Sequence, residues 1–394
     1  MKLLVFGSGL MGPAAAFNAL TAAQVSDVTI CDLSRTQLDG AKARLAGAPG
    51  VEKLSIVHID LSNRAQAAQT LAGFDVALAA LPRSAVPFAV QAAVDAGTPL
   101  IDLSSPPPEQ ADRLIGLVKQ RGALVIPGCG LEPGLTEIMA RHLAEKLDEV
   151  EEVHIKCGGV PSAPTPPLGY KIVFGGRRMP LHESDARVAR DGKLVAVPRY
   201  SEAEPVSFPG VGELEAWHEG FMPHLLELDI LHNLKYGTQK TVRWPGYADK
   251  VTVLKQLGLL STEPIDVGGS RVAPKDVLDA LLYPHVKMQP EDRDITLFRV
   301  DVSGHRNGRP CHYRVQMVDR YDEALGFTSM ARTTAMTGAI VARMVGDGAL
   351  QARGWVHPEQ VITGRLFDRL ISELAAIDVV FDMTVEETTP LAAE

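Results

Sequence analysis

The sequence predicts an α/β protein: a doubly wound parallel sheet comes first, and a second α+β domain with a mixed, largely antiparallel sheet follows. Three observations support this prediction. Apolar strand-like segments alternate with helical segments over residues 1 to 128, which is typical of parallel strands joined by crossover helices. A glycine-rich turn separates the first strand from the first helix. Beyond about residue 150 the pattern changes to antiparallel strands and longer loops.

The glycine-rich turn follows the expected strand Lys2–Phe6 and reads Gly7-Ser8-Gly9-Leu10-Met11-Gly12. Glycines at this spacing tighten the turn, let the backbone approach a pyrophosphate and let the next helix pack close to its strand. The helix expected over residues 11 to 20 would present its N-terminal amides to the phosphates. An ordinary glycine turn would not need this register, so the turn predicts a Rossmann dinucleotide-binding domain.

A second expected strand, Val28–Cys31, ends on Asp32. An acid about 20 residues beyond the glycines accepts hydrogen bonds from the adenosine ribose and repels a 2′-phosphate. Asp32 therefore predicts NAD as the cofactor in preference to NADP, although Arg35 could tolerate a phosphate.

In the rest of the first domain, expected strands and helices alternate along the chain. We expect helices near residues 36–45, 64–71, 86–96 and 109–121, and strands at 54–59, 76–81, 100–102 and 124–126. Six strands in right-handed connection make a complete domain, whose ligand lies beyond the carboxyl ends of the strands. The residues expected to bind the cofactor there are Gly7, Gly9, Leu10, Met11, Gly12, Asp32, Leu33, Asp60, Leu61, Ala80, Leu81, Pro82 and Leu103. For Asp60, Asp102 and Ser104, helix capping explains the residue type equally well.

The second domain should contain strands at residues 153–156, 194–197, 241–244, 295–302 and 312–318, with a hairpin turn at 304–308 joining the last two. Helices are expected at 249–257 and 274–282, and residues 162–167 form a proline-rich loop. Helices over 330–345 and 366–375 should return to the first domain. The predicted divisions are therefore residues 1–128, 129–330 and 331–394.

Composition excludes several classes of function. The 394 residues are 46% hydrophobic and 22% charged, as in a globular protein, and the net charge of -9 argues against nucleic acid as a partner. No long apolar run predicts a membrane span, and the strand at the start leaves no room for a signal peptide, so we expect a cytoplasmic protein. The four cysteines lie far apart, and the histidines form no ligand pair, so no metal is expected.

Five blocks, considered together, are similar to one family. They are Gly130–Gly134, Cys157–Pro161, Pro167–Lys171, Thr241–Gly246 and Ala331–Thr334. Their order and spacing resemble the saccharopine dehydrogenase and lysine 6-dehydrogenase family across nearly the whole chain. The resemblance is specific to the family and less specific to one substrate.

Within the family, the NAD-dependent lysine 6-dehydrogenases are the most similar, through Pro166–Leu168, Ser201–Pro205, Leu214–His218 and Pro358–Gln360. This resemblance implies an enzyme that oxidises the lysine side-chain amine and releases ammonia, NADH and a semialdehyde that cyclises to piperideine-6-carboxylate. The alternative is a saccharopine reductase, which joins glutamate to the semialdehyde with NADP; the Leu-Glu-Pro-Gly and Pro-Leu-Gly-Tyr-Lys blocks are closer to that branch. A non-catalytic NAD-binding regulatory protein is the alternative of another class.

Amine dehydrogenation sets the requirements for the site, which should lie in the interdomain cleft. The amine must lose a proton to a base, and Asp102 and Glu132 are the candidates, with pKa values that burial would raise. A substrate carboxylate calls for a guanidinium from Arg243, Arg332 or Arg83, for each of which an ion pair is an equal alternative. The remaining predicted contacts are Tyr170 and Lys171, as a polar lid contact or proton donor, with Gly159 and Thr333 from the family blocks. For Lys171 an ion pair is the favoured alternative. The amino-acid substrate is the expected partner, and the exposed edge of the second sheet favours a homodimer.

Overall fold

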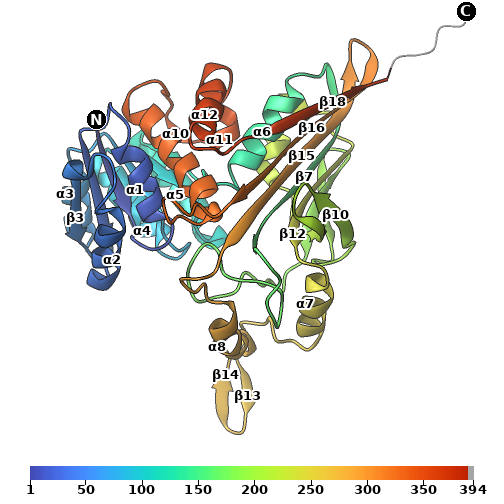
Figure 1. The fold of residues 1–394 in the computed structure, drawn as a ribbon, viewed down its shortest axis with the longest axis horizontal. Coiled ribbons are helices and arrows are strands. Elements are labelled where there is room, and N and C mark those ends of the chain that lie inside the picture. Colours follow the sequence, from blue (N-terminus) through green and yellow to red (C-terminus); the bar gives the residue numbers. More distant parts are fainter. Residues whose placement is uncertain (389–394) are drawn as a thin grey trace, which may run out of the picture. The chain divides into compact units, whose positions relative to one another are not determined.

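The computed structural model describes residues 1–388 and divides into two compact units, neither of them continuous in sequence (Figure 1). Unit 1 comprises Met1–Ile138 and Met330–Val380, and unit 2 comprises Met139–Ser329 and the segment that begins at Phe381. The chain thus leaves unit 1 within α6 (Leu135–Ala144) rather than at residue 128. The final segment, which was expected to be helical and to join the first domain, divides between the two units.

Unit 1 is built on a seven-stranded parallel sheet in the order β17-β6-β5-β4-β1-β2-β3. The doubly wound sheet that the sequence predicts is confirmed, because β1 to β6 have the order of a dinucleotide-binding domain. A seventh strand was not expected, since β17 is only two residues long. The strands are β1 Lys2–Phe6, β2 Asp27–Asp32, β3 Leu54–His58, β4 Val76–Ala79, β5 Leu100–Asp102, β6 Leu124–Ile126 and β17 Gly354–Trp355.

The helices of unit 1 begin and end on residues suited to those positions. Ser34 caps the second helix by accepting a hydrogen bond from the Gln37 amide, and Asn63 caps the third in the same way from Gln66. Gly97 and Gly122 end the fourth and fifth helices in the left-handed conformation. The helices are α1 Gly12–Leu20, α2 Arg35–Leu45, α3 Arg64–Leu71, α4 Val86–Ala96 and α5 Pro108–Arg121, with a short 3-10 turn, η1, at Val51–Lys53.

The long helix expected over residues 330–345 is interrupted by a π-helical segment. Helix α9 (Ser329–Ala331) continues into η4 (Arg332–Met336) and then α10 (Thr337–Gly346). Gly338 allows α10 to pack closely, since a Cβ there would lie 2.3 Å from Leu103 Cδ2. π-Helical turns often mark functional positions. Helices α11 (Pro358–Val361) and α12 (Arg365–Ala375) complete the segment.

Unit 2 is built on a nine-stranded mixed sheet, whose main path is β10-β11-β12-β7-β15-β16-β18. Among the strands within residues 1–388, the β12–β7 pair is the only parallel pair of this sheet, so the largely antiparallel sheet of the prediction is confirmed. The strands are β7 Glu149–Pro161, β8 Ala186–Arg190, β9 Lys193–Val197, β10 Glu204–Phe208, β11 Gly212–His218, β12 Tyr236–Arg243, β15 Asp294–Arg306, β16 Arg309–Arg320 and β18 Asp382–Glu387. A separate hairpin consists of β13 (Ile265–Val267) and β14 (Ser270–Val272).

Several strands of unit 2 are longer than the sequence pattern predicts. The hairpin turn expected over residues 304–308 is only Asn307-Gly308, because the pairing of β15 with β16 continues to Arg306 and Arg309. Both turn residues have positive φ, as two-residue hairpins require. Strand β18 was missed because it is rich in charge and exposed along its whole length, and β10 was missed because it is only five residues long and contains a proline.

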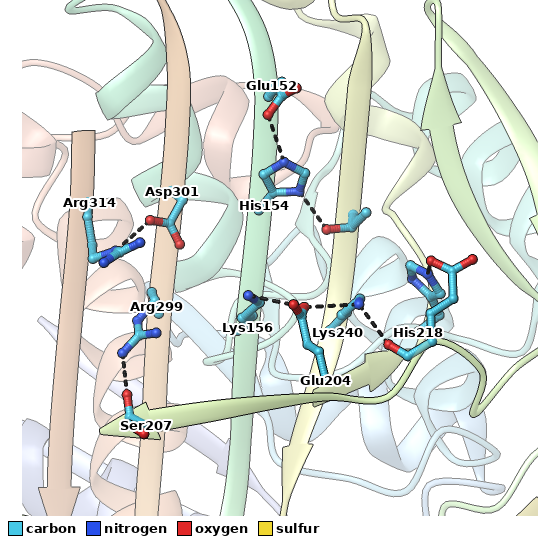
Figure 2. A network of polar contacts seen from close by, with 12 residues as sticks. Glu152, His154, Lys156, Glu204, Ser207, His218, Lys240, Arg299, Asp301 and Arg314 are labelled. Carbon is cyan, nitrogen blue, oxygen red and sulfur yellow. Dashed lines mark hydrogen bonds and ion pairs between the residues drawn. The ribbon is translucent and has the colours of Figure 1, made fainter. Parts of the chain in front are cut away.

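Polar side chains on one face of this sheet hold β10 in place (Figure 2). The Nζ atoms of Lys156 and Lys240 contact Oε1 of Glu204 at 3.1 and 3.0 Å, and Arg299 donates to the Ser207 carbonyl at 2.6 Å. The three cations are cross-strand neighbours on β12, β7 and β15. Like charges at such positions repel each other, and the acceptors of β10 offset this repulsion.

The helices of unit 2 pack around a second apolar core that contains Tyr170, Trp217 and Tyr247. They are α7 (Tyr247–Gln256) and α8 (Pro274–Val286), with 3-10 turns η2 (Pro223–Glu227) and η3 (Asp229–Leu231). None of the helices in residues 1–388 has the length and apolar character that a membrane crossing requires.

Candidate functional site

The glycine turn of unit 1 has two glycines that the backbone requires and one that faces open space. Gly7 has a φ of +95°, and a Cβ there would lie 2.3 Å from the Ala80 carbonyl oxygen. A Cβ on Gly12 would lie 1.8 Å from the Gly7 oxygen. A Cβ on Gly9 would meet no atom within 4 Å, although the residue lies in the same turn. The space over Gly9 therefore fits the close approach of a pyrophosphate.

Helix α1 begins at this turn without a side-chain cap. Its N-cap residue is Met11, with Pro13 in the first turn. The first amides of a helix carry partial positive charge and need an acceptor. Helix α1 therefore offers an anion site beside Gly9, which fits the phosphates of a dinucleotide.

Asp32 lies at the tip of β2 and connects this strand to the glycine turn. Its Oδ2 accepts hydrogen bonds from the Ser8 amide at 2.7 Å and the Ser8 hydroxyl at 2.8 Å, and its Oδ1 accepts from the Ser34 amide at 2.8 Å. A carboxylate has about four lone-pair sites, so it still has capacity for a ribose hydroxyl. The neighbouring Leu33 is 63% exposed. The role of Ser8 was not predicted, because the fingerprint leaves its position unspecified.

Three strand ends in unit 1 carry the same turn, Asp-Leu-Ser. The serine amides donate to the aspartates at 2.8 Å in Asp32-Leu33-Ser34, 2.8 Å in Asp60-Leu61-Ser62 and 3.0 Å in Asp102-Leu103-Ser104. This is the Asx turn that short acids favour. At Asp60, which is exposed, hydrogen bonds from Ser62 hold the pKa of the carboxyl below its ordinary value. The cap of α3 is Asn63, so Asp60 closes a turn and does not cap the helix.

Asp102 differs from the other two aspartates because it is fully buried. Burial raises the pKa of Asp102 to about 7, against the smaller opposite effect of hydrogen bonds from Ser104. Its Oδ1 accepts from the Ser104 amide and hydroxyl at 3.0 and 3.2 Å, while Oδ2 has no hydrogen-bond partner among residues 1–388. A carboxyl with a free oxygen and a pKa near neutrality at the ligand end of a sheet suits acid–base chemistry.

Arg83 follows β4 and braces the loop after Asp102. The exposed side chain donates from Nε to the Ser105 carbonyl at 3.1 Å and from a terminal nitrogen to the Pro106 carbonyl at 3.2 Å. The adjoining backbone is fixed to β1, since the Ala80 amide donates to the Phe6 carbonyl at 2.8 Å. The loop segment Leu81–Pro82 lies between these two anchors.

The loop after β6 carries Glu132 and packs against the π-helical segment. Glu132 is partly buried and precedes a cis proline, Pro133. The Cys129 amide donates to the Asp102 carbonyl at 2.8 Å, which ties this loop to β5. A Cβ on Gly130 would lie 2.9 Å from Thr334 Cγ2. Both predicted bases therefore lie on joined loops of unit 1.

Arg332 and Thr333 lie in η4 and are buried. A terminal nitrogen of Arg332 donates to the Ile377 carbonyl, and Thr333 donates to the Met330 carbonyl at 3.5 Å. Arg332 thus holds the segment after α12. That Arg332 binds a substrate carboxylate stays a prediction.

In unit 2, Arg243 lies at the end of β12 among aromatic rings. It is 8% exposed, and its guanidinium lies 4.6 Å from the centre of the Tyr170 ring and 5.8 Å from that of Tyr247. The predicted Gly159 is paired with Thr296 inside the sheet. Sequence analysis did not identify Tyr247, because a tyrosine at the start of a helix carries no signal of a site.

Lys171 is engaged in an ion pair within unit 2. Its Nζ lies 3.1 Å from Oδ2 of Asp292 and 3.4 Å from the Lys287 carbonyl oxygen, and only 10% of its side chain is exposed. The ion pair is an ample structural reason for a lysine at this position. That Lys171 donates a proton to the substrate stays a prediction.

The parallel sheet, the glycine turn and the N-terminus of α1 define a dinucleotide-binding protein of the Rossmann class. Family models extend this definition to most of the chain: one described as "Saccharopine dehydrogenase NADP binding domain" matches residues 3–120, and one described as "Saccharopine dehydrogenase C-terminal domain" matches residues 130–379. The chain belongs to the saccharopine dehydrogenase family. The resemblance inferred from the sequence blocks is therefore confirmed at the level of the family.

Individual relatives are distant. The chain is 24% identical over 372 residues to the mitochondrial alpha-aminoadipic semialdehyde synthase of Bos taurus, which aligns over 76% of this chain and 40% of that protein. It is 22% identical over 458 residues to the saccharopine dehydrogenase [NADP(+), L-glutamate-forming] of Schizosaccharomyces pombe, over 94% of this chain and 97% of the relative. The apo saccharopine dehydrogenase (L-Glu forming) of Saccharomyces cerevisiae has the same fold, with a TM-score of 0.78, 18% identity and coverage of 98% and 99% of the two chains.

Proposed function

We propose that the protein is a nicotinamide-dinucleotide-dependent oxidoreductase that oxidises a carbon–nitrogen bond of an amino-acid derivative, in the manner of a saccharopine dehydrogenase. The relatives named above support a secondary amine, such as saccharopine, as the substrate in preference to lysine. Oxidation would turn the amine into an imine, and water would then release an aldehyde and glutamate. The bound dinucleotide would supply the acceptor for the hydride.

The raised pKa of the buried Asp102 carboxyl is the observation that supports this proposal. An amine that loses a hydride must also lose its proton, and the base must be unprotonated at the working pH. A pKa of about 7 lets Asp102 accept a proton near neutrality. Its Oδ2 is buried and has no hydrogen-bond partner among residues 1–388, so an amine that reached this atom would find an acceptor. In the reductive direction the same carboxyl would return the proton.

Glu132 is the second candidate for the base. It lies on the loop that the Cys129 amide ties to the Asp102 carbonyl. Glu132 remains partly exposed, whereas Asp102 is fully buried. Since burial is what brings a carboxyl toward neutral pKa, we assign the proton to Asp102 and leave Glu132 as a polar contact.

For the cofactor we propose NAD. Asp32 places a negative charge at the tip of β2, where the adenosine ribose is expected. The Ser8 and Ser34 hydrogen bonds hold the carboxylate at that tip. The description of the family model refers to NADP, so this chain would differ from that description at Asp32.

The test is a turnover panel with purified protein. Saccharopine, lysine and other basic amino acids are each offered with NAD and with NADP, and the reductive direction is assayed with glutamate and the semialdehyde. We expect saccharopine-dependent NADH formation that Asp102→Asn abolishes and Asp112→Asn, an exposed control on α5, preserves. Release of ammonia from lysine with NAD would instead support a lysine 6-dehydrogenase, which the NAD preference proposed for Asp32 also favours. Dinucleotide binding without turnover on any substrate would contradict both functions and support a regulatory protein.

A further inference from the structure

Four aromatic side chains of unit 2 form a buried cluster beside Arg243. Tyr247 and Trp217 are parallel, with ring centres 5.9 Å apart and an interplanar angle of 1°. Tyr200 lies 4.7 Å from Trp217, and Tyr170 meets Tyr247 edge-on at 5.9 Å. Each ring is at most 3% exposed. We call these four residues the aromatic cluster.

The backbone around Arg243 also leaves room for its guanidinium. One guanidinium nitrogen donates to the neighbouring Val242 carbonyl at 2.8 Å. A Cβ on Gly158 would lie 2.8 Å from that nitrogen and 2.3 Å from the Val242 oxygen. Glycine at position 158 thus leaves room for the guanidinium, and the rings of Tyr170 and Tyr247 limit its movement on other sides.

We propose that Tyr170 and Tyr247 are positioning residues that hold the Arg243 guanidinium ready to bind a carboxylate of the substrate. An arginine loses much rotamer freedom when it binds a ligand, and a guanidinium fixed beforehand loses less. Aromatic faces attract a guanidinium without occupying all of its N–H donors. The inference rests on the proposed function, because it requires a substrate that carries a carboxylate.

The experiment separates the ring from the hydroxyl. Tyr247→Phe keeps the ring, so we expect KM for the amino-acid substrate within about twofold of wild type, whereas Tyr247→Leu and Tyr170→Leu should raise KM about tenfold with little change in kcat. The matched control is Tyr321→Leu. Tyr321 lies 4.2 Å from the Arg293 guanidinium in the same unit, so this variant removes an equivalent contact elsewhere and should leave KM unchanged.

Because both tyrosines are buried, a double-mutant cycle guards against a general loss of structure. In an Arg243→Ala background, Tyr247→Leu should raise KM no further, since the ring acts through the guanidinium. Leucine variants that melt like wild type and keep its KM would overturn the proposal, as would an equal rise of KM in the Arg243→Ala background.

Calorimetric titration with saccharopine, glutamate and lysine distinguishes this proposal from the proposed function. Binding that weakens in the leucine variants, without turnover in the wild type, would leave the positioning role intact and contradict only the function. Turnover in the wild type, together with binding that is unchanged in the leucine variants, would support the proposed function and contradict the positioning role. A wild type that binds none of these carboxylates would overturn the positioning role.

Discussion

The carboxylate of Asp32 accepts both hydrogen bonds that Ser8 can donate, one from the backbone amide and one from the hydroxyl. The residue expected to recognise the ribose therefore also shapes the turn expected to approach the pyrophosphate. Two functions expected of a dinucleotide site would thus be coupled through one side chain.

Replacing this carboxylate tests the cofactor preference. Asp32→Ala should weaken NAD binding about tenfold and NADP binding less, since the lost acceptor is one that only an unphosphorylated ribose uses. Dissociation constants from fluorescence titration provide the measurement, with Asp112→Ala as the control. Equal losses for the two dinucleotides would remove the ribose role and leave Asp32 as a brace for Ser8.

Gly9 and Gly12 are a matched pair of positions for testing the glycine turn. Gly9→Ala has open space for its Cβ, so its melting temperature should equal that of the wild type, while dinucleotide affinity falls about tenfold or more because the phosphates lose that space. Gly12→Ala should lower stability as well, by about 1–3 kcal/mol, since its Cβ would overlap the Gly7 carbonyl. Thermal melts and titrations together check both outcomes. Full affinity in Gly9→Ala would place the dinucleotide away from the turn.

Asp102 should affect stability and activity in opposite directions. Its folded pKa of about 7 lies above its ordinary value of 3.8, so the folded protein binds the proton more tightly and the free energy of unfolding falls as pH rises from about 4 to about 7. Integrated over that window the loss is about 4 kcal/mol. Asp102→Asn should remove this loss and be more stable than wild type at pH 8, with little difference near pH 4.

Activity follows the ionised form of the same group. In the wild type, kcat/KM for amine oxidation should rise with pH through about 7 and then level off. Denaturant titrations and pH–rate profiles on the two proteins supply both measurements. A wild-type profile flat from pH 6 to 8, with the stability difference present, would leave Asp102 a buried structural carboxyl and move the base to Glu132.

The Lys171–Asp292 pair predicts a stability effect. Lys171→Met leaves a mostly buried carboxylate without its cation, which should cost about 3 kcal/mol or more. Replacing both partners, as Lys171→Met with Asp292→Leu, should recover a large part of that loss. Urea denaturation measures it, with the exposed pair Arg178 and Asp276 as the control. A single variant as stable as wild type would remove the structural explanation for Lys171.

Arg243→Ala should raise KM for a carboxylate-bearing substrate between about tenfold and a hundredfold, because charge-assisted hydrogen bonds are lost. Arg293→Ala removes a partly exposed arginine that also faces a tyrosine ring, and it should leave KM unchanged. Steady-state kinetics at saturating dinucleotide decide the matter. An unchanged KM in Arg243→Ala would assign the carboxylate to Arg332 or Arg83.

The sequence predicts unit 1 well because its signals are local. Gly7 has a positive φ and Gly12 lies against the Gly7 carbonyl within one turn, and buried parallel strands appear in the sequence as plain apolar runs. The seventh strand escaped prediction because Gly354–Trp355 forms no pattern by itself and pairs with residues far away in the chain.

Unit 2 was predicted less completely, since its contacts join distant segments. Nothing near Tyr247 in sequence indicates that it stacks on Trp217, and the position of Arg243 depends on a glycine in another strand. The burial of Asp102 also results from packing, so its raised pKa could be suspected from its place at a strand end but not read from the residue itself.

The division of unit 1 between two distant stretches of chain has a consequence during synthesis. Helix α10 covers Leu103 and the β6–α6 loop through Gly338, yet it leaves the ribosome only after the whole of residues 139–329 has been made. At about 5–20 residues per second, the first sheet waits many seconds without its cover. The emerging N-terminal half therefore exposes apolar surface to the cell for that interval, and chaperones that bind nascent chains would find it there.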